Sequence, residues 1–252
     1  MAGERPAQRD LQHTLRLLWR AQEPPRRGPR GSLSLDKVVA EAVRLADEEG
    51  IGAVSMRRVA EGLGVTTMSL YRYVPGKDDL LDLMLEMVTG RPDTSAWPGT
   101  WRGDLECWAR QMRHRLHEHP WMLDVHISGP PLGPDNLAWM EAALGSLAEA
   151  GLDARDAVGV LMILSGYVRS QALLELSLAR AAHRTGVRPE EWGRVYTGML
   201  RNAADDGRYP HLMRAVESGA FTDGDEDGDA DFEYGLCVTL DGIAARVPPA
   251  AG

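Results

Sequence analysis

The sequence has 252 residues, of which 44% are hydrophobic and only 6% aromatic, and its formal net charge is −9. This length suits one small domain plus a larger one with a core of its own. Convincing strand runs are absent, so the composition predicts an all-α fold. The two cysteines, Cys107 and Cys237, lie far apart, which argues against a disulfide framework.

The charges are distributed unevenly along the chain. The first 88 residues carry equal numbers of basic and acidic side chains, so the acidic excess lies entirely in the remainder. A neutral-to-basic end on an acidic body suits a protein that presents that end to nucleic acid. The chain opens without the apolar run of a secretory signal, and its richest apolar stretch, 157–168, is too short and interrupted to span a bilayer. We therefore expect a cytoplasmic protein with no membrane partner.

Residues 1–33 are expected to form an N-terminal extension. Leu11, Leu15 and Leu18 recur at helical spacing and predict a short amphipathic helix over 10–20. A run of prolines, glycines and arginines then interrupts regular structure. This run contains three basic residues, Arg26, Arg27 and Arg30. They could contact the minor groove or the flanking DNA backbone, or they could belong to a solvated linker.

Four helices are predicted next, over residues 34–50, 55–64, 67–73 and 77–89. Ser34 and Ser55 are suited to cap the first two, and Gly50 to close the first. Gly64 supplies the positive φ, or the close approach, that a tight turn between the two short helices requires. Pro75 and the glycine after it stop the third helix.

The third helix has the properties of a DNA recognition helix. Its first turn presents small polar side chains, and an arginine follows, so it can enter a major groove. Any three-helix cluster could contain such a turn. Here, however, Tyr71, Tyr73 and Lys77 follow at spacings that place two hydroxyls and an ammonium near backbone phosphates.

The string LGVTTMSLYRYVPGKDDLLDLM, from Leu63 to Met84, closely resembles the helix-turn-helix of the TetR-type repressors. Residues 35–88 look like the DNA-binding domain of that family. The resemblance implies base-edge contacts from Arg57, Thr67, Met68, Ser69 and Arg72. It also implies phosphate contacts from Ser55, Tyr71, Tyr73 and Lys77, with Tyr73 in place of a histidine that is common in the family.

The remainder is also patterned as helices, near 101–118, 120–127, 135–150, 154–183, 189–204, 210–217 and 230–246. Residues 97–247 resemble the regulatory domain of the tetracycline-repressor branch, notably at VHISGPP (125–131) and FEYGL (232–236). The resemblance implies a ligand-binding bundle that forms a homodimer through the helices near 154–183 and 230–246, which Gly235 and Ala244 would let approach closely. Such a dimer matches a palindromic double-stranded operator. The predicted domains are thus 1–33, 34–89 and 97–247.

In tetracycline-binding members the histidine that matches His126 holds a magnesium–drug chelate. Here Gly129, Trp108 and Met112 stand at the positions of the family's pocket threonine, asparagine and phenylalanine. We therefore expect an apolar or aromatic effector with no metal or other cofactor. The candidate ligand contacts are Trp108, Met112, His126, Trp139 and Tyr167, although each could instead be an ordinary structural residue.

These features predict a repressor that a small molecule releases from its operator when the helix over 77–89 swings and separates the two DNA-binding heads. An activator with the same head is the alternative. No catalytic constellation or phosphate loop occurs, so we expect no enzyme. Two metal sites are also disfavoured. The acidic loop 223–231 lacks the glutamate of a calcium loop, and His114, His117 and His119 lack the spacing of a zinc site.

Overall fold

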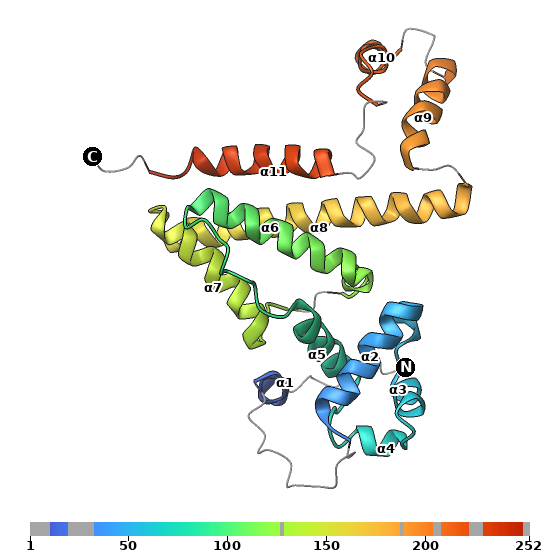
Figure 1. The fold of residues 1–252 in the computed structure, drawn as a ribbon, viewed down its shortest axis with the longest axis vertical. Helices are drawn as coiled ribbons and strands as arrows, with labels where there is room; N and C mark the ends of the chain where they lie inside the picture. The colour runs from blue at the N-terminus through green and yellow to red at the C-terminus, as the bar shows by residue number, and fades with distance from the viewer. Residues whose placement is uncertain are drawn as a thin grey trace, which may run out of the picture. The chain divides into compact units, whose positions relative to one another are not determined.

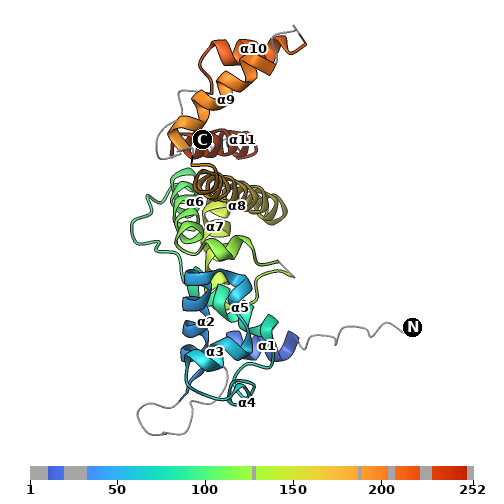
Figure 2. The same ribbon diagram turned by 90° about the vertical axis from the view of Figure 1, so that its right-hand side faces the viewer.

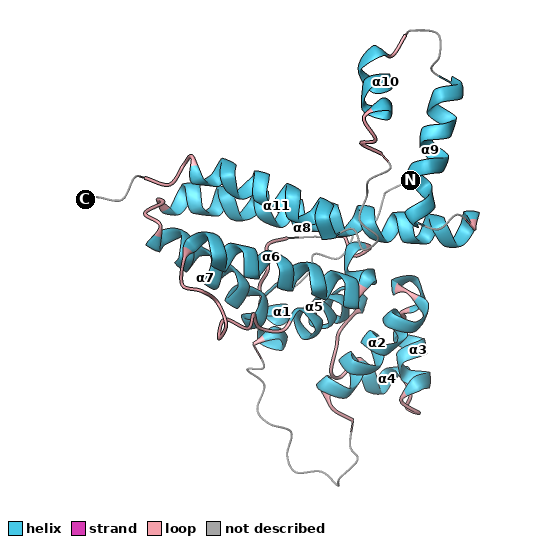
Figure 3. Ribbon diagram, turned by 45° about the horizontal axis from the view of Figure 1, so that its top comes forward, coloured by secondary structure: helices cyan, strands magenta, loops and turns pink. Residues whose placement is uncertain are grey.

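The computed structural model describes residues 11–19, 33–126, 129–186, 189–203, 208–221 and 229–248. Within these ranges every regular element is a helix and no strand occurs (Figure 3), which confirms the all-α prediction. The chain divides into two compact units, Met1–Leu147 and Ala148–Gly252. The basic residues at 26, 27 and 30, most of the acidic loop 223–231, and the segment 127–128 lie outside the described ranges.

The first unit contains a four-helix head (Figure 2). Its helices are α2 (Leu35–Glu49), α3 (Met56–Gly62), α4 (Thr67–Leu70) and α5 (Lys77–Thr89), with a short 3-10 turn, η1 (Ile51–Ala53), after α2. One apolar face of each helix is buried in a shared core, which includes Val38, Ala42, Val59, Leu70 and Met84. In α2 the buried side chains recur at the three- and four-residue spacing of an amphipathic helix; they are Val38, Val39, Ala42, Leu45 and Ala46.

The predicted helix ends are largely confirmed. The Ser34 and Ser55 hydroxyls accept hydrogen bonds from the backbone amides three residues ahead, at 3.3 and 3.2 Å. Each therefore satisfies an amide that the first helical turn leaves without a partner. Gly50 ends α2 with a φ of 82°, and its amide donates to the Ala46 carbonyl.

Helix α4 is shorter than predicted, because it ends at Leu70 instead of residue 73. The amides of Tyr73 and Val74 both donate to the Leu70 carbonyl, so the chain tightens into a turn. Val74 precedes Pro75, and the proline ring disfavours the α conformation in the residue before it. The recognition segment is thus one helical turn followed by an exposed turn that carries Tyr71 and Arg72.

The N-terminal extension contains the predicted helix, α1 (Leu11–Leu18). Leu17 and Leu18 are buried, with exposed fractions of 1% and 5%. Both lie beside α5 of the head, so this part of the extension packs against the domain that follows it.

The first unit also contains α6 (Trp101–Glu118), the 3-10 turn η2 (Pro120–Leu123) and α7 (Pro134–Glu149). The predicted helix over 120–127 is therefore only this short turn. Trp108 of α6 and Trp139 of α7 meet edge to face, with ring centroids 5.7 Å apart. The buried carboxylate of Asp104 accepts hydrogen bonds from the Ser146 hydroxyl and the Gly99 amide, both at 2.9 Å, and so ties α6 to α7.

The second unit consists of α8 (Ala154–Thr185), α9 (Pro189–Ala203), α10 (Pro210–Glu217) and α11 (Asp229–Ala244). Helices α8 and α11 run side by side (Figure 1). The Tyr167 ring stacks on Phe232 at 5.7 Å, and its hydroxyl donates to the Phe232 carbonyl at 2.6 Å. Tyr167 therefore joins the two helices.

Helix α8 is longer than the apolar stretch that the sequence indicated. Over Ala154–Ala182 it is long and apolar enough to cross a membrane by length and composition alone. The core helix of a globular protein meets the same criterion. Leu161, Leu164 and Val168 are buried inside the protein, whereas Met162 and Ile163 are more than half exposed. One apolar face of α8 is therefore buried within the chain, and a second apolar face is exposed.

Gly235 is expected to be essential for the contact between α8 and α11. A Cβ at this position would lie 2.6 Å from the Tyr167 hydroxyl and under 3 Å from its ring. Because stacking and a hydrogen bond fix that ring, Gly235→Ala should lower the free energy of unfolding by about 1–3 kcal/mol. Gly198→Ala is the control, since nothing lies within 4 Å of its Cβ. Urea denaturation of both variants measures the difference, and equal midpoints would contradict this packing.

Candidate operator-binding and effector-binding sites

The turn between α3 and α4 has the geometry of a helix-turn-helix. Gly64 has a φ of 66°, which side chains with a Cβ rarely adopt. The Val65 amide donates to the Ala60 carbonyl at 3.0 Å and closes the turn. The Ser69 amide donates to the Thr66 carbonyl at 2.9 Å, and the hydroxyls of these two residues lie 3.0 Å apart. The predicted positive φ of Gly64 is thus confirmed.

The side chains predicted to contact base edges lie at the surface of α3, α4 and the turn that follows. Met68 is 74% exposed, Arg72 is exposed, and Thr67 and Ser69 are half-exposed at the start of α4. The Arg57 guanidinium is largely exposed and forms an ion pair with Glu61 one turn ahead at 2.8 Å. This surface therefore combines hydroxyls, one apolar side chain and two guanidiniums, the groups that read base edges in a major groove.

The residues predicted to contact phosphates have differing environments. Tyr71 and Lys77 are exposed, and Lys77 stands at the start of α5. Ser55 is occupied as the cap of α3. The Tyr73 hydroxyl donates to the Leu33 carbonyl at 2.9 Å, a contact that fixes the segment leading into α2. To donate to a phosphate, as predicted, the Tyr73 hydroxyl would have to give up its hydrogen bond to the Leu33 carbonyl.

Arg58, next to the candidate Arg57, has a structural role. Its guanidinium donates to both carboxylate oxygens of Glu49, at 2.7 and 2.6 Å, and so joins α3 to the end of α2. These hydrogen bonds lower the pKa of Glu49 below its ordinary value. The bidentate geometry holds the helix-turn-helix against α2 while Arg57 faces outward.

The structure also reveals a junction that the sequence analysis missed, between α5 and α7. Glu86, only 8% exposed, accepts hydrogen bonds from the backbone amides of Asp135 and Asn136 and from the Asn136 side chain. A carboxylate is favoured there because the first turn of a helix leaves amides without partners. The Trp139 indole donates to the Gly90 carbonyl at 2.8 Å, also at the C-terminal end of α5.

A second junction joins α2 to the turn η2. The Asp47 carboxylate lies 2.8 Å from His119 Nδ1 and accepts a hydrogen bond from the Trp121 indole at 2.7 Å. The sequence near His119 does not indicate this contact, because Asp47 lies 72 positions away. Glu86 stands with Asp82 in the apolar run LLDLMLEMV, but the sequence does not indicate its partners, because the residues that it caps are 49 and 50 positions away.

The candidate effector residues fall in both units. Trp108 and Trp139 are each 3% exposed, and the Trp108 indole donates to the Trp139 carbonyl at 3.0 Å. Met112 is half-buried one turn further along α6, and His126 is exposed after η2. Tyr167 belongs to the second unit, where it packs on α11. Both indole N–H groups and the phenol are thus already hydrogen-bonded to backbone, and both indoles are almost fully buried.

Within the part of the chain that the structure describes, no group of three or more histidine, cysteine, aspartate or glutamate residues could hold a metal ion. His114 and His117 are exposed on α6.

An exposed one-turn recognition helix on a helical head that adjoins a helical body defines a helix-turn-helix DNA-binding regulator. Comparison with known proteins identifies its family. The family model "Bacterial regulatory proteins, tetR family" matches residues 38–84, and "Tetracyclin repressor-like, C-terminal domain" matches residues 92–247. The chain belongs to the TetR family of transcriptional regulators.

The chain is 40% identical to the transcriptional repressor DrrR1 of Streptomyces coeruleorubidus, over 96% of this chain and 89% of that one. It is 32% identical to the class A tetracycline repressor of Escherichia coli, over 85% and 92% of the two chains. The crystal structure of ActR from Streptomyces coelicolor in complex with actinorhodin matches with a TM-score of 0.67 and 28% identity, over 87% and 99%. The protein is a DNA-binding transcriptional regulator of this family, and DrrR1 is a relative that is named as a repressor.

Proposed function

We propose that this protein is a repressor that reads a palindromic operator with α4 and the turn after it. The observation that carries this proposal is the exposed first turn of α4, held by the Gly64 turn and flanked by Arg57 and Arg72. In this assignment Arg57, Thr67, Met68, Ser69 and Arg72 contact base edges. Ser55, Tyr71, Tyr73 and Lys77 contact phosphates, and the predicted domains 34–89 and 97–247 divide DNA binding from effector binding.

The dimer is proposed to form through α8 and α11. Both helices expose large apolar side chains, notably Met162, Ile163, Tyr234 and Val238, at 54–74% exposure. A Cβ added at Gly159, Gly166 or Gly242 would have nothing within 4 Å, so another backbone can approach closely there. Apolar side chains beside small residues suit a helix-to-helix interface between two copies of the chain.

We expect Met162→Glu combined with Val238→Glu to convert the dimer to a monomer, because two carboxylates would be desolvated in the interface. Operator affinity should fall at least about a hundredfold, since a single head loses the second half-site. Light scattering after gel filtration measures the mass, and fluorescence anisotropy measures DNA binding. Arg201→Glu, which adds a carboxylate on exposed α9, is the control. A dimeric double variant would place the interface elsewhere.

The effector is proposed to be an apolar or aromatic molecule whose contacts in the first unit are Trp108, Met112, His126 and Trp139. Tyr167, in the second unit, stays a separate prediction. The edge-to-face Trp108–Trp139 pair supports this class, as does the binding of actinorhodin by ActR. Titration of tryptophan fluorescence with actinorhodin and, separately, with minocycline plus Mg²⁺ tests it. Quenching by actinorhodin supports the assignment, and a response to minocycline only with Mg²⁺ would contradict it.

Operator release is proposed to follow a change in the position of α5 relative to α7. Glu86 and Trp139 join these helices directly, so a ligand that moves α7 also acts on the head. The coupling must be reciprocal, so operator should weaken effector binding by the same factor. Equal effector affinity with and without operator would contradict this mechanism. We assign the protein a cytoplasmic, non-enzymatic role, and the named repressors among its relatives favour repression over activation.

The decisive experiment is selection of genomic fragments with the purified protein, followed by binding of the enriched DNA across a salt series. Recovery of a palindrome would support sequence-specific operator binding. Salt-sensitive binding without an enriched sequence would contradict it, since contacts to phosphates alone carry no sequence information.

A further inference from the structure

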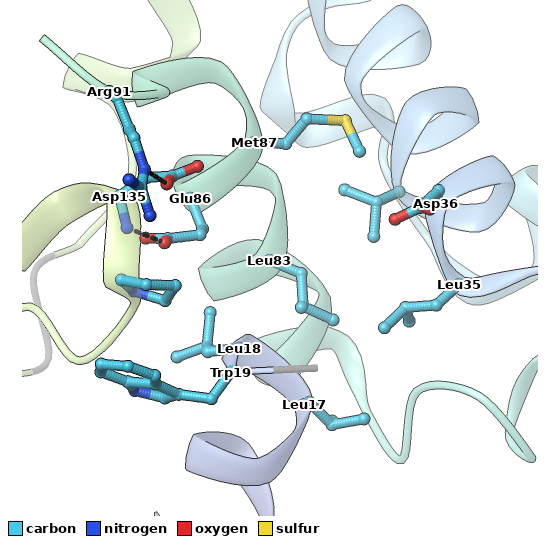
Figure 4. Close-up of a pocket in the computed structure, with 12 residues that line it drawn as sticks. Leu17, Leu18, Trp19, Leu35, Asp36, Leu83, Glu86, Met87, Arg91 and Asp135 are labelled. Carbon is cyan, nitrogen blue, oxygen red and sulfur yellow. Dashed lines mark hydrogen bonds and ion pairs between the residues drawn. The ribbon is translucent and has the colours of Figure 1, made fainter. Parts of the chain in front are cut away.

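Helix α1 lies outside both family matches, which begin at residues 38 and 92. It is nevertheless docked on the first unit. Thr14, Leu17 and Leu18 are 1%, 1% and 5% exposed. In Figure 4, Leu17 and Leu18 face Leu83 of α5. This burial shows that α1 is part of the folded first unit.

Two side chains, one in the middle of α1 and one just after it, are hydrogen-bonded to different parts of the unit. In the middle of α1, the Thr14 hydroxyl donates to the carboxylate of Asp79 in the first turn of α5, at 2.7 Å. Just beyond its end, the Trp19 indole donates to the Leu132 carbonyl, in the turn that precedes α7, at 2.9 Å. The stretch from Thr14 to Trp19 therefore links the start of α5 to the segment that leads into α7.

These two hydrogen bonds of α1 act alongside the contact between Glu86 and the start of α7. Glu86 caps the first turn of α7 from the C-terminal half of α5, whereas Thr14 holds the N-terminal end of α5. A swing of α5 relative to the segment that leads into α7 strains the two α1 hydrogen bonds, because Asp79 belongs to α5 and Leu132 to that segment. The cost of the swing thus includes weakening the docking of α1.

The docking is incomplete, which makes undocking feasible. A cavity of about 300 Å³ lies between α1, α2, α5 and the start of α7 (Figure 4). Trp19 on its wall is 53% exposed. A short helix beside a cavity has few apolar contacts to lose, so its local opening is less costly than that of a core helix.

We propose that α1 is a clamp that restrains α5 against the turn before α7 and so sets how readily the head moves. The proposal rests on the α5 movement proposed above for operator release. It assigns the N-terminal extension a regulatory role, in which Thr14 and Trp19 are the positioning residues of the clamp.

The test uses the full-length protein and needs neither operator nor effector. Thr14→Val with Trp19→Phe removes both hydrogen bonds and keeps the apolar bulk. Leu17→Ala with Leu18→Ala removes the apolar anchor instead. Arg16→Gln, an exposed position on the same helix, is the control. Thermal unfolding first establishes that each variant is folded.

Two readouts report docking and restraint. Hydrogen exchange of residues 11–19 should be at least about tenfold faster in both clamp variants than in the parent. Electron-spin distances between labels at Met68→Cys and Glu141→Cys, with Cys107 and Cys237 replaced by serine, measure α4 against α7. Dilution with excess unlabelled protein restricts the signal to pairs within one protomer. We expect a narrow distribution in the parent and in Arg16→Gln, and a broad one in both clamp variants.

Unprotected exchange of α1 in the parent, or an unchanged distance distribution in both clamp variants, would overturn the proposal. Failure of the parent to select an operator would contradict the proposed function instead, and the distances would still decide whether α1 restrains the head. Operator affinity, where it is measurable, should fall about threefold to tenfold in the clamp variants, because a less restrained head is less preorganised for DNA.

Discussion

Arg72→Ala is expected to weaken binding to the selected operator by about tenfold to a hundredfold, while affinity for unrelated DNA changes little. Arg72 is exposed in the turn directly after α4, where a guanidinium can reach a base edge. Loss of a base contact lowers the affinity for the correct sequence specifically. Fluorescence anisotropy with operator and scrambled duplexes at one salt concentration measures both affinities.

Two further variants separate base readout from electrostatics. Lys77→Ala should weaken binding to all DNA and reduce the salt dependence by about one phosphate contact. Arg110→Ala removes an equal charge on α6, where Arg110 pairs with Glu106 at 3.3 Å, and should leave operator binding unchanged. If Arg72→Ala weakened operator and scrambled DNA equally, Arg72 would be a phosphate contact and the base-edge assignment would be wrong.

Glu86→Ala is expected to lower the free energy of unfolding by about 3 kcal/mol. The substitution removes a nearly buried carboxylate that accepts three hydrogen bonds at the start of α7, and leaves two backbone amides without that acceptor. Chemical denaturation measures the stability. Hydrogen exchange at residues 135–137 should accelerate, because the first turn of α7 loses its cap.

The control for this prediction is Glu106→Ala on the surface of α6. Glu106 pairs with Arg102 at 3.5 Å and Arg110 at 3.3 Å in a partly exposed setting. Such surface ion pairs contribute little, so its loss should cost less than about 1 kcal/mol. Equal destabilisation by the two substitutions would mean that Glu86 does not join α5 to α7 in solution.

The sequence predicted those features that depend on neighbours within a few residues. Ser34 and Ser55 cap their helices because a hydroxyl before a helix meets an amide three residues ahead. Gly64 adopts the predicted positive φ for the equally local reason that it lacks a Cβ. The inward positions of α2 followed from helical periodicity. The short α4 shows the limit of this approach, since helical periodicity continued to residue 73 but Pro75 restricted the preceding residue.

The sequence by itself thus determined the all-α fold and the exposed recognition segment. It also carried the resemblance to the TetR family that the comparisons confirm. Only the tertiary structure decided how the parts are joined. Glu86 meets residues 49 and 50 positions away, Asp47 meets His119 and Trp121, and Trp19 meets Leu132. No periodicity specifies such pairs, because each depends on where the packing of distant helices places a donor beside an acceptor.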